Sequence, residues 1–142
     1  MGNSDHRHLK YLQNICTYLF MNYTKPLTID KMAVDLHISK RKVQRIIHDH
    51  FHTTFKKLLN AIRLYKTIEH YKQNNESILS LALECGFTEE RLLKDWWRKC
   101  ITVPFNKIGK ITDPIEANFN EECRYVLEKM LNCIRNDRNI QN

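Results

Sequence analysis

The sequence predicts an all-α fold in which a long helix joins two copies of one helical unit and a tail helix follows. The 142 residues include only three Gly and three Pro, too few for the many turns that a β-sandwich or barrel needs. Apolar residues recur at helical spacing along most of the chain, which indicates amphipathic helices. One block of this pattern returns 49 to 50 residues later, which indicates an internal repeat.

The first half of the chain divides into four predicted helices. The first runs from about His6 to Asn22 and stops before Lys25-Pro26, because proline disfavours helix in the residue before it. Two short helices follow, each preceded by a hydroxyl side chain that can accept from free backbone amides. We expect the short helices at 29–36, capped by Thr28, and at 40–51, capped by Ser39, and the longer fourth helix at 54–73.

The second half repeats the two short helices. Ser77 caps a helix whose apolar positions reach Cys85, Gly86 is its left-handed stop residue, and Thr88 caps the next helix. Matched positions lie 49 apart before the turn and 50 apart after it, so one residue is inserted at the second turn. The matched apolar positions are Ile29 with Ile78, Met32 with Leu81, Ala33 with Ala82, Ile38 with Phe87, Val43 with Leu93, Ile46 with Trp96, Ile47 with Trp97 and Phe51 with Ile101.

Residues 110–142 form a predicted extension to the double unit of residues 1–109. Asp113-Pro114 interrupts the helical pattern, Asn118 and Glu121 have the spacing of a capping box, and the tail helix should end near Arg138. Burying one Leu or Phe is worth roughly 1.5–3 kcal/mol, so the tail must pack against something. Folding back onto the domain is favoured over pairing with a second copy. The apolar stripe consists of Phe119, Cys123, Val126, Leu127, Met130, Leu131 and Ile134.

Positive charge is concentrated in the two repeated units. Residues 1–109 carry a formal charge of +8, against −1 for residues 110–142. A short helix, a tight turn and a second helix with a basic outer face form a helix-turn-helix, whose second helix enters the major groove of duplex DNA. The alternative is an ordinary bundle with a solvated charged face. The predicted contacts are Arg41, Gln44 and Arg45 to base edges and Lys40 and Lys42 to phosphates, with Ser39 in the same set.

The run from Pro26 to about Lys107 resembles the DNA-binding domain of the AraC/XylS transcription regulators. The most specific matching segments are ISKRKVQR, the Arg63-Leu64 pair and ILSLALECGF, followed by the proline in ITVPF. The similarity is greatest to the stand-alone, MarA-type members, in which no ligand domain precedes. The resemblance implies a transcription activator that binds an asymmetric DNA site as a monomer and contacts RNA polymerase.

The second unit departs from the family pattern. Asp95 stands where the family commonly has a DNA-contacting Arg, and Ile108-Gly109 stands where the family has Tyr-Arg. The second reading helix has a net charge of only +1, so we expect it to recognise bases less strongly than the first. An alternative is a protein-binding relative, whose second unit and tail helix dock RNA polymerase or another regulator. The predicted DNA contacts of the second unit are Thr88, Glu90, Arg91, Lys94 and Arg98.

Other kinds of site have little support in the sequence. The five cysteines are scattered and form no CxxC pair, which is typical of free thiols in a reducing cytosol; a redox-sensing cysteine is the less favoured alternative. We therefore expect a cytoplasmic protein with no signal peptide and no membrane span. His48 and His52 share a helix face without a nearby third ligand, so a metal site is also less favoured. Neither enzymatic activity nor a cofactor is expected, because no phosphate loop or nucleophile elbow occurs.

Overall fold

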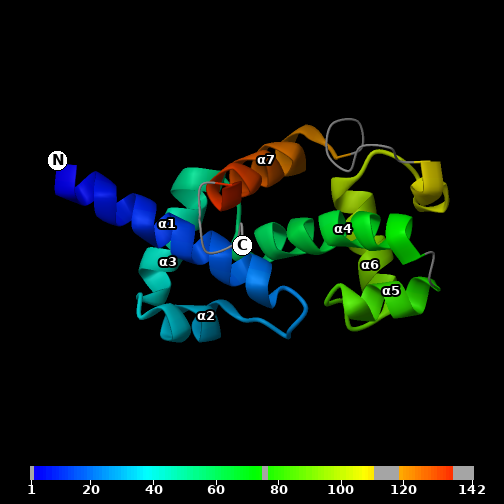
Figure 1. Ribbon diagram of the computed structural model, residues 1–142, viewed down its shortest axis with the longest axis horizontal. Helices are drawn as coiled ribbons and strands as arrows, with labels where there is room; N and C mark the ends of the chain where they lie inside the picture. The colour runs from blue at the N-terminus through cyan, green and yellow to red at the C-terminus, as the bar shows by residue number, and fades with distance from the viewer. Residues whose placement is uncertain (1, 75–76, 111–118, 136–142) are drawn as a thin grey trace.

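The computed structural model describes residues 2–74, 77–110 and 119–135, and these residues are helical throughout apart from short connections (Figure 1). The predicted all-α class is confirmed. The first helix begins earlier than expected, and the predicted tail end near Arg138 lies outside the described residues. The elements are α1 (Gly2–Asn22), α2 (Ile29–Leu36), α3 (Lys40–Phe51), α4 (Phe55–Asn74), α5 (Ile78–Glu84), α6 (Glu90–Cys100), the 3₁₀ helix η1 (Phe105–Lys110) and α7 (Glu121–Arg135).

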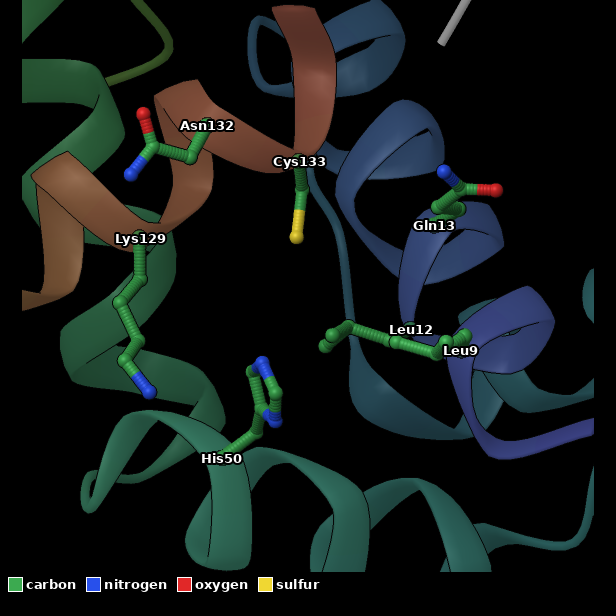
Figure 2. A pocket seen from close by; sticks show the side chains of 7 residues that line it. All are labelled: Leu9, Leu12, Gln13, His50, Lys129, Asn132 and Cys133. Carbon is green, nitrogen blue, oxygen red and sulfur yellow. The ribbon is translucent and has the colours of Figure 1, made fainter. Parts of the chain in front are cut away.

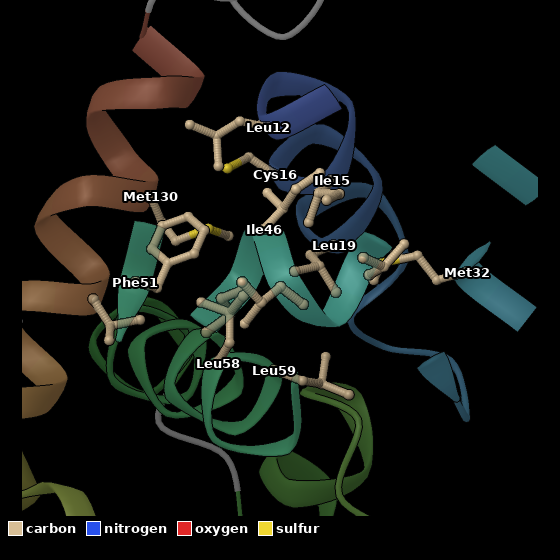
Figure 3. Packing of buried hydrophobic residues seen from close by; sticks show 14 of the residues in the cluster. Leu12, Ile15, Cys16, Leu19, Met32, Ile46, Phe51, Leu58, Leu59 and Met130 are labelled. Carbon is tan, nitrogen blue, oxygen red and sulfur yellow. The ribbon is translucent and has the colours of Figure 1, made fainter. Parts of the chain in front are cut away.

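Helix α4 is shared by two hydrophobic cores. One face of α4 places Leu58 and Ile62 in a core with α1, α2 and α3 (Figure 3). The opposite face places Leu64 and Ile68 in a second core with α5, α6 and η1. All four side chains are fully buried. The long helix therefore acts as a common wall, and each helix-turn-helix unit packs on its own side of it.

Matched positions of the predicted repeat have similar burial in the two units. The matched residues Met32 and Leu81 are both fully buried, as are Val43 and Leu93. One pair differs: Ile46 is buried, whereas its match Trp96 is only partly buried. From these matches both tryptophans are expected to pack in the core: Trp97 is fully buried there, and Trp96 packs against the second core while remaining partly exposed.

Three of the four predicted caps of the repeated helices are confirmed. The hydroxyls of Thr28, Ser39 and Ser77 accept hydrogen bonds from the backbone amides of Lys31, Lys42 and Ser80. The prediction for Thr88 is wrong, because α6 begins one residue later and its N-cap is Glu89, which makes no side-chain capping bond. The residue inserted at the second turn explains the shift, since position 89 is 50 residues after Ser39.

Arg63 of α4 holds the loop between α1 and α2. Its Nε donates to the Tyr23 carbonyl and its Nη2 to the Lys25 carbonyl, both at 2.9 Å. Burial lowers the pKa of this guanidinium, because desolvation disfavours its charge, and the two carbonyls compensate part of that cost. Both carbonyls belong to the loop between α1 and α2, so the side chain fixes this loop against the wall helix.

Gly86 lies against the same loop. It has φ of +94°, and a Cβ placed on it would collide with the Tyr23 carbonyl oxygen. The predicted left-handed residue after α5 is therefore confirmed. Glycine is also required here because the Tyr23 carbonyl leaves no space for a side chain. The turn of the second unit reaches the loop of the first only because no side chain stands between them.

We predict that Gly86→Ala lowers the free energy of unfolding by more than about 1 kcal/mol, because alanine is strained at positive φ and would push the loop away. Gly109→Ala is the matched control, since its Cβ would lie 3.5 Å from Tyr71 in ordinary contact. Urea denaturation of both variants measures the difference. Equal stabilities would contradict the packing described at Gly86.

The tail helix α7 folds back on the domain, as favoured from the sequence, and contacts α1, α3 and α4. It belongs to both cores: Met130 packs with α1 and α3, while Leu127 packs in the second core. Ion pairing of Lys57 Nζ with Glu122 Oε1 at 2.9 Å adds to the contact with α4. Of the seven stripe residues, all but Leu131 are buried.

The tail helix begins differently from the predicted capping box. The Cys123 amide donates to Asn120 Oδ1 at 3.0 Å, so Asn120 caps the helix and Glu121 is its first residue. Glu121 therefore does not have the role assigned to it with Asn118, which lies outside the described residues. The backbone N–H of Asn120 also donates to the Cys100 carbonyl at 2.8 Å, and this bond joins the start of α7 to the end of α6.

We predict that Leu127→Ala lowers the free energy of unfolding by about 2–5 kcal/mol, the usual cost of truncating a fully buried leucine. Glu128→Ala, at the next and exposed position of α7, should change it little. Thermal and urea unfolding of the full chain provide the measurement. A variant as stable as the parent would mean that α7 does not belong to the folded core.

Candidate nucleic-acid interface

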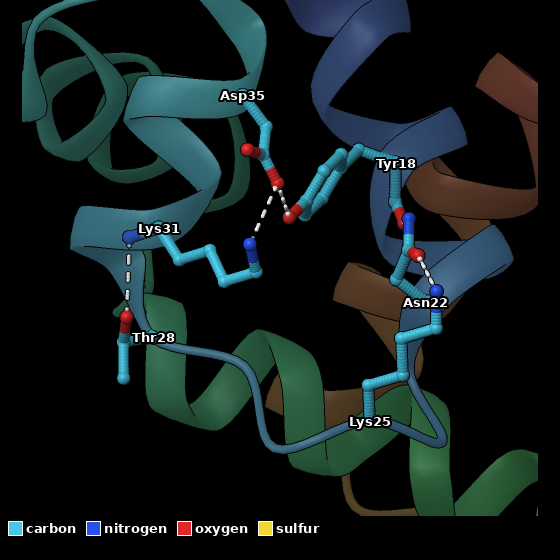
Figure 4. A network of polar contacts seen from close by, with 6 residues as sticks. All are labelled: Tyr18, Asn22, Lys25, Thr28, Lys31 and Asp35. Carbon is cyan, nitrogen blue, oxygen red and sulfur yellow. Dashed lines mark hydrogen bonds and ion pairs between the residues drawn. The ribbon is translucent and has the colours of Figure 1, made fainter.

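The first helix-turn-helix unit is fixed by polar contacts between α1 and α2 (Figure 4). The Tyr18 hydroxyl donates to Asp35 Oδ2 at 2.6 Å, and Lys31 Nζ lies 3.6 Å from the same oxygen. Desolvation and this hydrogen bond raise the pKa of Tyr18 to about 12, while the bond lowers the pKa of Asp35. The contacts hold α2 against α1, and α3 follows from the left-handed turn at His37.

The outer face of α3 presents the residues predicted to contact DNA. Lys40, Arg41, Lys42, Gln44 and Arg45 are all exposed, as is their N-cap Ser39. The opposite face, with Val43, Ile46 and Ile47, is buried in the first core. The helix is therefore anchored by its apolar face and offers a positively charged face to solvent.

Two of these cations already have partners in the protein. Lys40 Nζ lies 3.2 Å from Asp30 Oδ1 on α2, and Lys42 Nζ lies 4.1 Å from the centre of the Tyr11 ring on α1. Arg41 and Arg45 make no ion pair within the described residues. Their guanidinium groups are thus available for bidentate hydrogen bonds to guanine or to phosphate.

The outer face of α6 is organised differently. Arg91 lies 3.8 Å from Glu89, Lys94 lies 3.0 Å from Glu90, and Arg98 is paired with Asp95. The remaining cation, Lys99, lies 4.6 Å from the centre of the Trp96 ring. Each cation of the second reading helix therefore has a partner on the same helix or at its start, and the pairs largely neutralise its surface. Thr88, also predicted to contact DNA, is exposed in the turn before α6.

Two clefts connect the surfaces of α3 and α6. A cleft of about 390 Å³ is lined by Gln44 and His48 of α3 and by Lys56 near the start of α4. Lys56 also lines a second cleft, of about 330 Å³, together with Asp95 and Lys99 of α6. Of the predicted contacts, Gln44 lines the first cleft and Thr88 lines the second. Because Lys56 in the first turn of α4 lines both clefts, their lining residues from Gln44 of α3 to Lys99 of α6 form one candidate surface. We call this the reading surface.

The residues in the middle of the reading surface were not predicted from the sequence. Lys56 and Asn60 lie near the N-terminus of α4 and line the second cleft, and Thr54 accepts a hydrogen bond from the Lys57 amide at the start of that helix. Two consecutive lysines in the first turn of α4, Lys56-Lys57, were the available signal, because cations are unfavourable at a helix N-terminus. Lys57 is ion-paired with Glu122 of α7, whereas no ion pair of Lys56 occurs within the described residues, so Lys56 is the cation available to a partner.

The histidines around the end of α3 are not arranged as one helix face. His52 is the C-cap in a left-handed conformation with φ of 53°, so it has left the helix that carries His48. His48 Nδ1 lies 3.3 Å from Asp49 Oδ1, while the His52 ring packs near Tyr125 of α7. Within the described residues, no group of three or more His, Cys, Asp or Glu side chains is placed to hold a metal ion.

A search of the helices in the described part of the chain finds none with the length and apolar composition of a membrane span.

Comparison with known sequences identifies the family. A helix-turn-helix domain family matches residues 32–108. The chain is 26% identical over 93 residues to the HTH-type transcriptional regulator GbdR of Pseudomonas aeruginosa, a match covering 66% of this chain and 25% of GbdR. It is 25% identical over 101 residues to the HTH-type transcriptional activator RhaS of Pectobacterium atrosepticum, covering 71% of this chain and 36% of RhaS. The chain therefore matches only about a quarter to a third of the length of these relatives.

Two solved structures share the fold. A Listeria innocua protein of unknown function superposes with a TM-score of 0.63 at 19% identity, over 72% of this chain and 97% of that one. A transcriptional regulator from Chromobacterium violaceum, described by its AraC-type DNA-binding domain, gives 0.59 at 18% identity over 95% of this chain and 99% of that one.

These findings define the class of protein. Two helix-turn-helix units on a common wall helix, one of them with a basic reading face, form a helix-turn-helix DNA-binding domain. The chain belongs to the helix-turn-helix family of AraC-type transcription regulators.

We predict that Asp95→Arg tightens binding to duplex DNA and steepens its salt dependence by about one unit of log–log slope. The change removes a carboxylate from the reading surface, adds a cation and releases Arg98 from its ion pair. Glu128→Arg, on the exposed side of α7, makes the same change of net charge outside the reading surface and is the control. Gel-shift titrations at several salt concentrations give both quantities; unchanged binding would place Asp95 away from the DNA.

Proposed function

We propose that this domain binds duplex DNA sequence-specifically and that α3 makes the principal base contacts. The observation that carries the proposal is the difference in charge pairing between the reading helices. Arg41 and Arg45 stand exposed without an ion pair among the described residues, whereas Arg91, Lys94 and Arg98 of α6 are paired with carboxylates. In the major groove, Arg41, Gln44 and Arg45 would read base edges, and Lys40 and Lys42 would exchange their internal partners for phosphates.

The second unit has a supporting role in this proposal. Its Arg91, Lys94 and Arg98 would contact the DNA backbone once the ion pairs open, with Thr88 and Glu90 at the start of the helix. Opening exposed pairs costs little, because each is worth less than about 1 kcal/mol in water. Lys56 in the middle of the reading surface would contact the phosphates between the two groove segments. Such a binding mode uses two different helices, so the DNA site would be asymmetric.

The proposed regulator acts as a monomer in the cytoplasm and activates transcription through contact with RNA polymerase. Fold-back of α7 supports the monomer, because the apolar stripe that would form a dimer seam is covered by α1, α3 and α4. The similarity to the activator RhaS supports activation. Sedimentation of the domain with and without its DNA site, followed by transcription with purified polymerase, tests these two points.

A second candidate function is protein docking by the second unit. The neutralised surface of α6 favours it, as does the partly buried Trp96, which with Leu92 lines the second cleft. A domain that reads DNA and a domain that docks a protein differ in how strongly their affinity for duplex DNA depends on salt concentration. Steep salt dependence together with sequence preference is expected for the first, while weak binding without preference would favour the second.

We predict that Arg45→Ala and Gln44→Ala each weaken binding to the best DNA site by about 1–3 kcal/mol and relax sequence preference locally. Lys42→Ala should weaken binding to all sequences alike, because a phosphate contact carries no sequence information. The sites are first selected from a random duplex library, and affinities are then measured by fluorescence anisotropy. Arg91→Ala, at the matched position to Arg41, should have a smaller effect; if it exceeds Arg45→Ala, the second unit is the principal reader.

A further inference from the structure

Four of the five cysteines form two thiol pairs, and each pair joins α7 to the rest of the domain. Cys16 of α1 belongs to the first core and Cys133 packs against it, where α1 and α7 are in contact, and each of these thiols shifts the pKa of the other. Cys123 and Cys100, at the end of α6, form the corresponding pair in the second core. The first pair lies in the core of the first unit and the second pair in the core of the second. The residues of each pair are more than 20 positions apart in sequence, so the pairs exist only because α7 folds back.

The two pairs differ in their access to solvent. Cys100 and Cys123 are 0% and 3% exposed, and Cys16 is 1% exposed. Cys133 is only partly buried and lines a cavity of about 230 Å³ between α1, α3 and α7. Figure 2 shows its sulfur pointing into that cavity, with His50 of α3 on the opposite side and Lys129, one turn earlier on α7, beside the cavity. The Cys133 thiol is therefore accessible from the cavity, whereas the Cys16 thiol is buried in the first core.

The surroundings of Cys133 favour its thiolate. The hydrogen bond from the Cys16 thiol and the nearby Lys129 ammonium lower the pKa of Cys133, although partial burial opposes them. The pKa of Cys16 is raised, by the hydrogen bond to Cys133 and by burial. An accessible thiolate beside a buried thiol is the arrangement expected of cysteines that are oxidised reversibly.

We propose that Cys133 is an oxidation site for a small hydroperoxide entering through this cavity, and that Cys16 converts the oxidised residue to a disulfide. The Cys133 thiolate attacks one peroxide oxygen, the O–O bond breaks, and hydroxide leaves as Cys133 becomes a sulfenic acid. The Cys16 sulfur then attacks the sulfenic sulfur, and the S–O bond breaks. With the Cys16 proton, the oxygen leaves as water. Two thiols are thereby oxidised by two electrons, and one hydrogen peroxide is reduced to two waters.

The disulfide would attach α7 covalently to α1 across the first core. A bond between Cys16 and Cys133 closes a loop of most of the chain, and cross-links of long loops restrict the unfolded state most. Both thiols lie at the first core, where α1 and α7 pack together. The oxidised form should therefore melt at a higher temperature than the reduced form.

The test uses the full chain, reduced and freed of reductant, with hydrogen peroxide as the oxidant. We expect free thiols to fall from five to three per chain, a Cys16–Cys133 disulfide peptide in non-reducing digests, and a raised melting temperature that dithiothreitol reverses. Cys16→Ser should stop the reaction at a sulfenic acid on Cys133, which dimedone traps. Cys100→Ser is the matched control, because its pair has no access to the cavity, and it should leave the reaction unchanged.

A second variant keeps the test decisive if a serine variant does not fold. Lys129→Gln removes the cation beside the thiol but no thiol and should slow oxidation of Cys133 several-fold, while Lys57→Gln, beside the buried pair, should not. The proposal is overturned if Cys133 of the folded chain is oxidised no faster than the fully buried Cys100 and Cys123. It is equally overturned if Lys129→Gln reacts at the parent rate, or if the disulfide joins Cys100 to Cys123 or two separate chains.

Discussion

The burial of opposite faces of α4 in two cores is the interaction on which the rest of this structure depends. Leu58 and Ile62 hold the first unit, and Leu64 and Ile68 hold the second. Arg63, between these faces, adds hydrogen bonds to the loop that precedes α2. Because both units pack on one stiff helix, the orientation of α3 relative to α6 follows from side-chain packing. Helix α7 strengthens the arrangement by contributing to both cores.

The two units share buried apolar positions and differ in their exposed residues. Their matched apolar positions are buried to similar degrees, which keeps the geometry of each helix pair. Positions that are free of core packing have diverged, and Arg45 in the first unit matches Asp95 in the second. This division suits a domain that binds an asymmetric partner, because one frame presents two surfaces of different charge. The same separation of frame and surface leaves Trp96 partly exposed, where Ile46 is part of the core.

Periodicity was sufficient to predict α1 to α7, the matched apolar positions and the buried face of the tail, but the 3₁₀ helix η1 was not predicted. Sequence patterns failed where a position depends on tertiary neighbours. The matched apolar positions on either side of the second turn do not show whether the inserted residue lies before or after Thr88. Only the backbone of the structure shows that Glu89 is the N-cap of α6. The partners of exposed cations, such as Tyr11 beneath Lys42, come from other helices. The thiol pairs could not be predicted either, because hydrophobic periodicity shows which face of a helix is buried but not which residues of other helices it contacts.

The central claim is that α3 dominates DNA recognition and α6 contributes salt-sensitive backbone contacts. Titration of the ¹⁵N-labelled domain with its selected duplex, followed by NMR at low and at moderate salt, tests it most directly. The account predicts that signals of Arg41, Gln44 and Arg45 shift strongly at both salt concentrations, whereas those of Arg91, Lys94 and Arg98 return towards their free positions as salt rises. Shifts in α6 that equal those in α3 and persist in salt would contradict it.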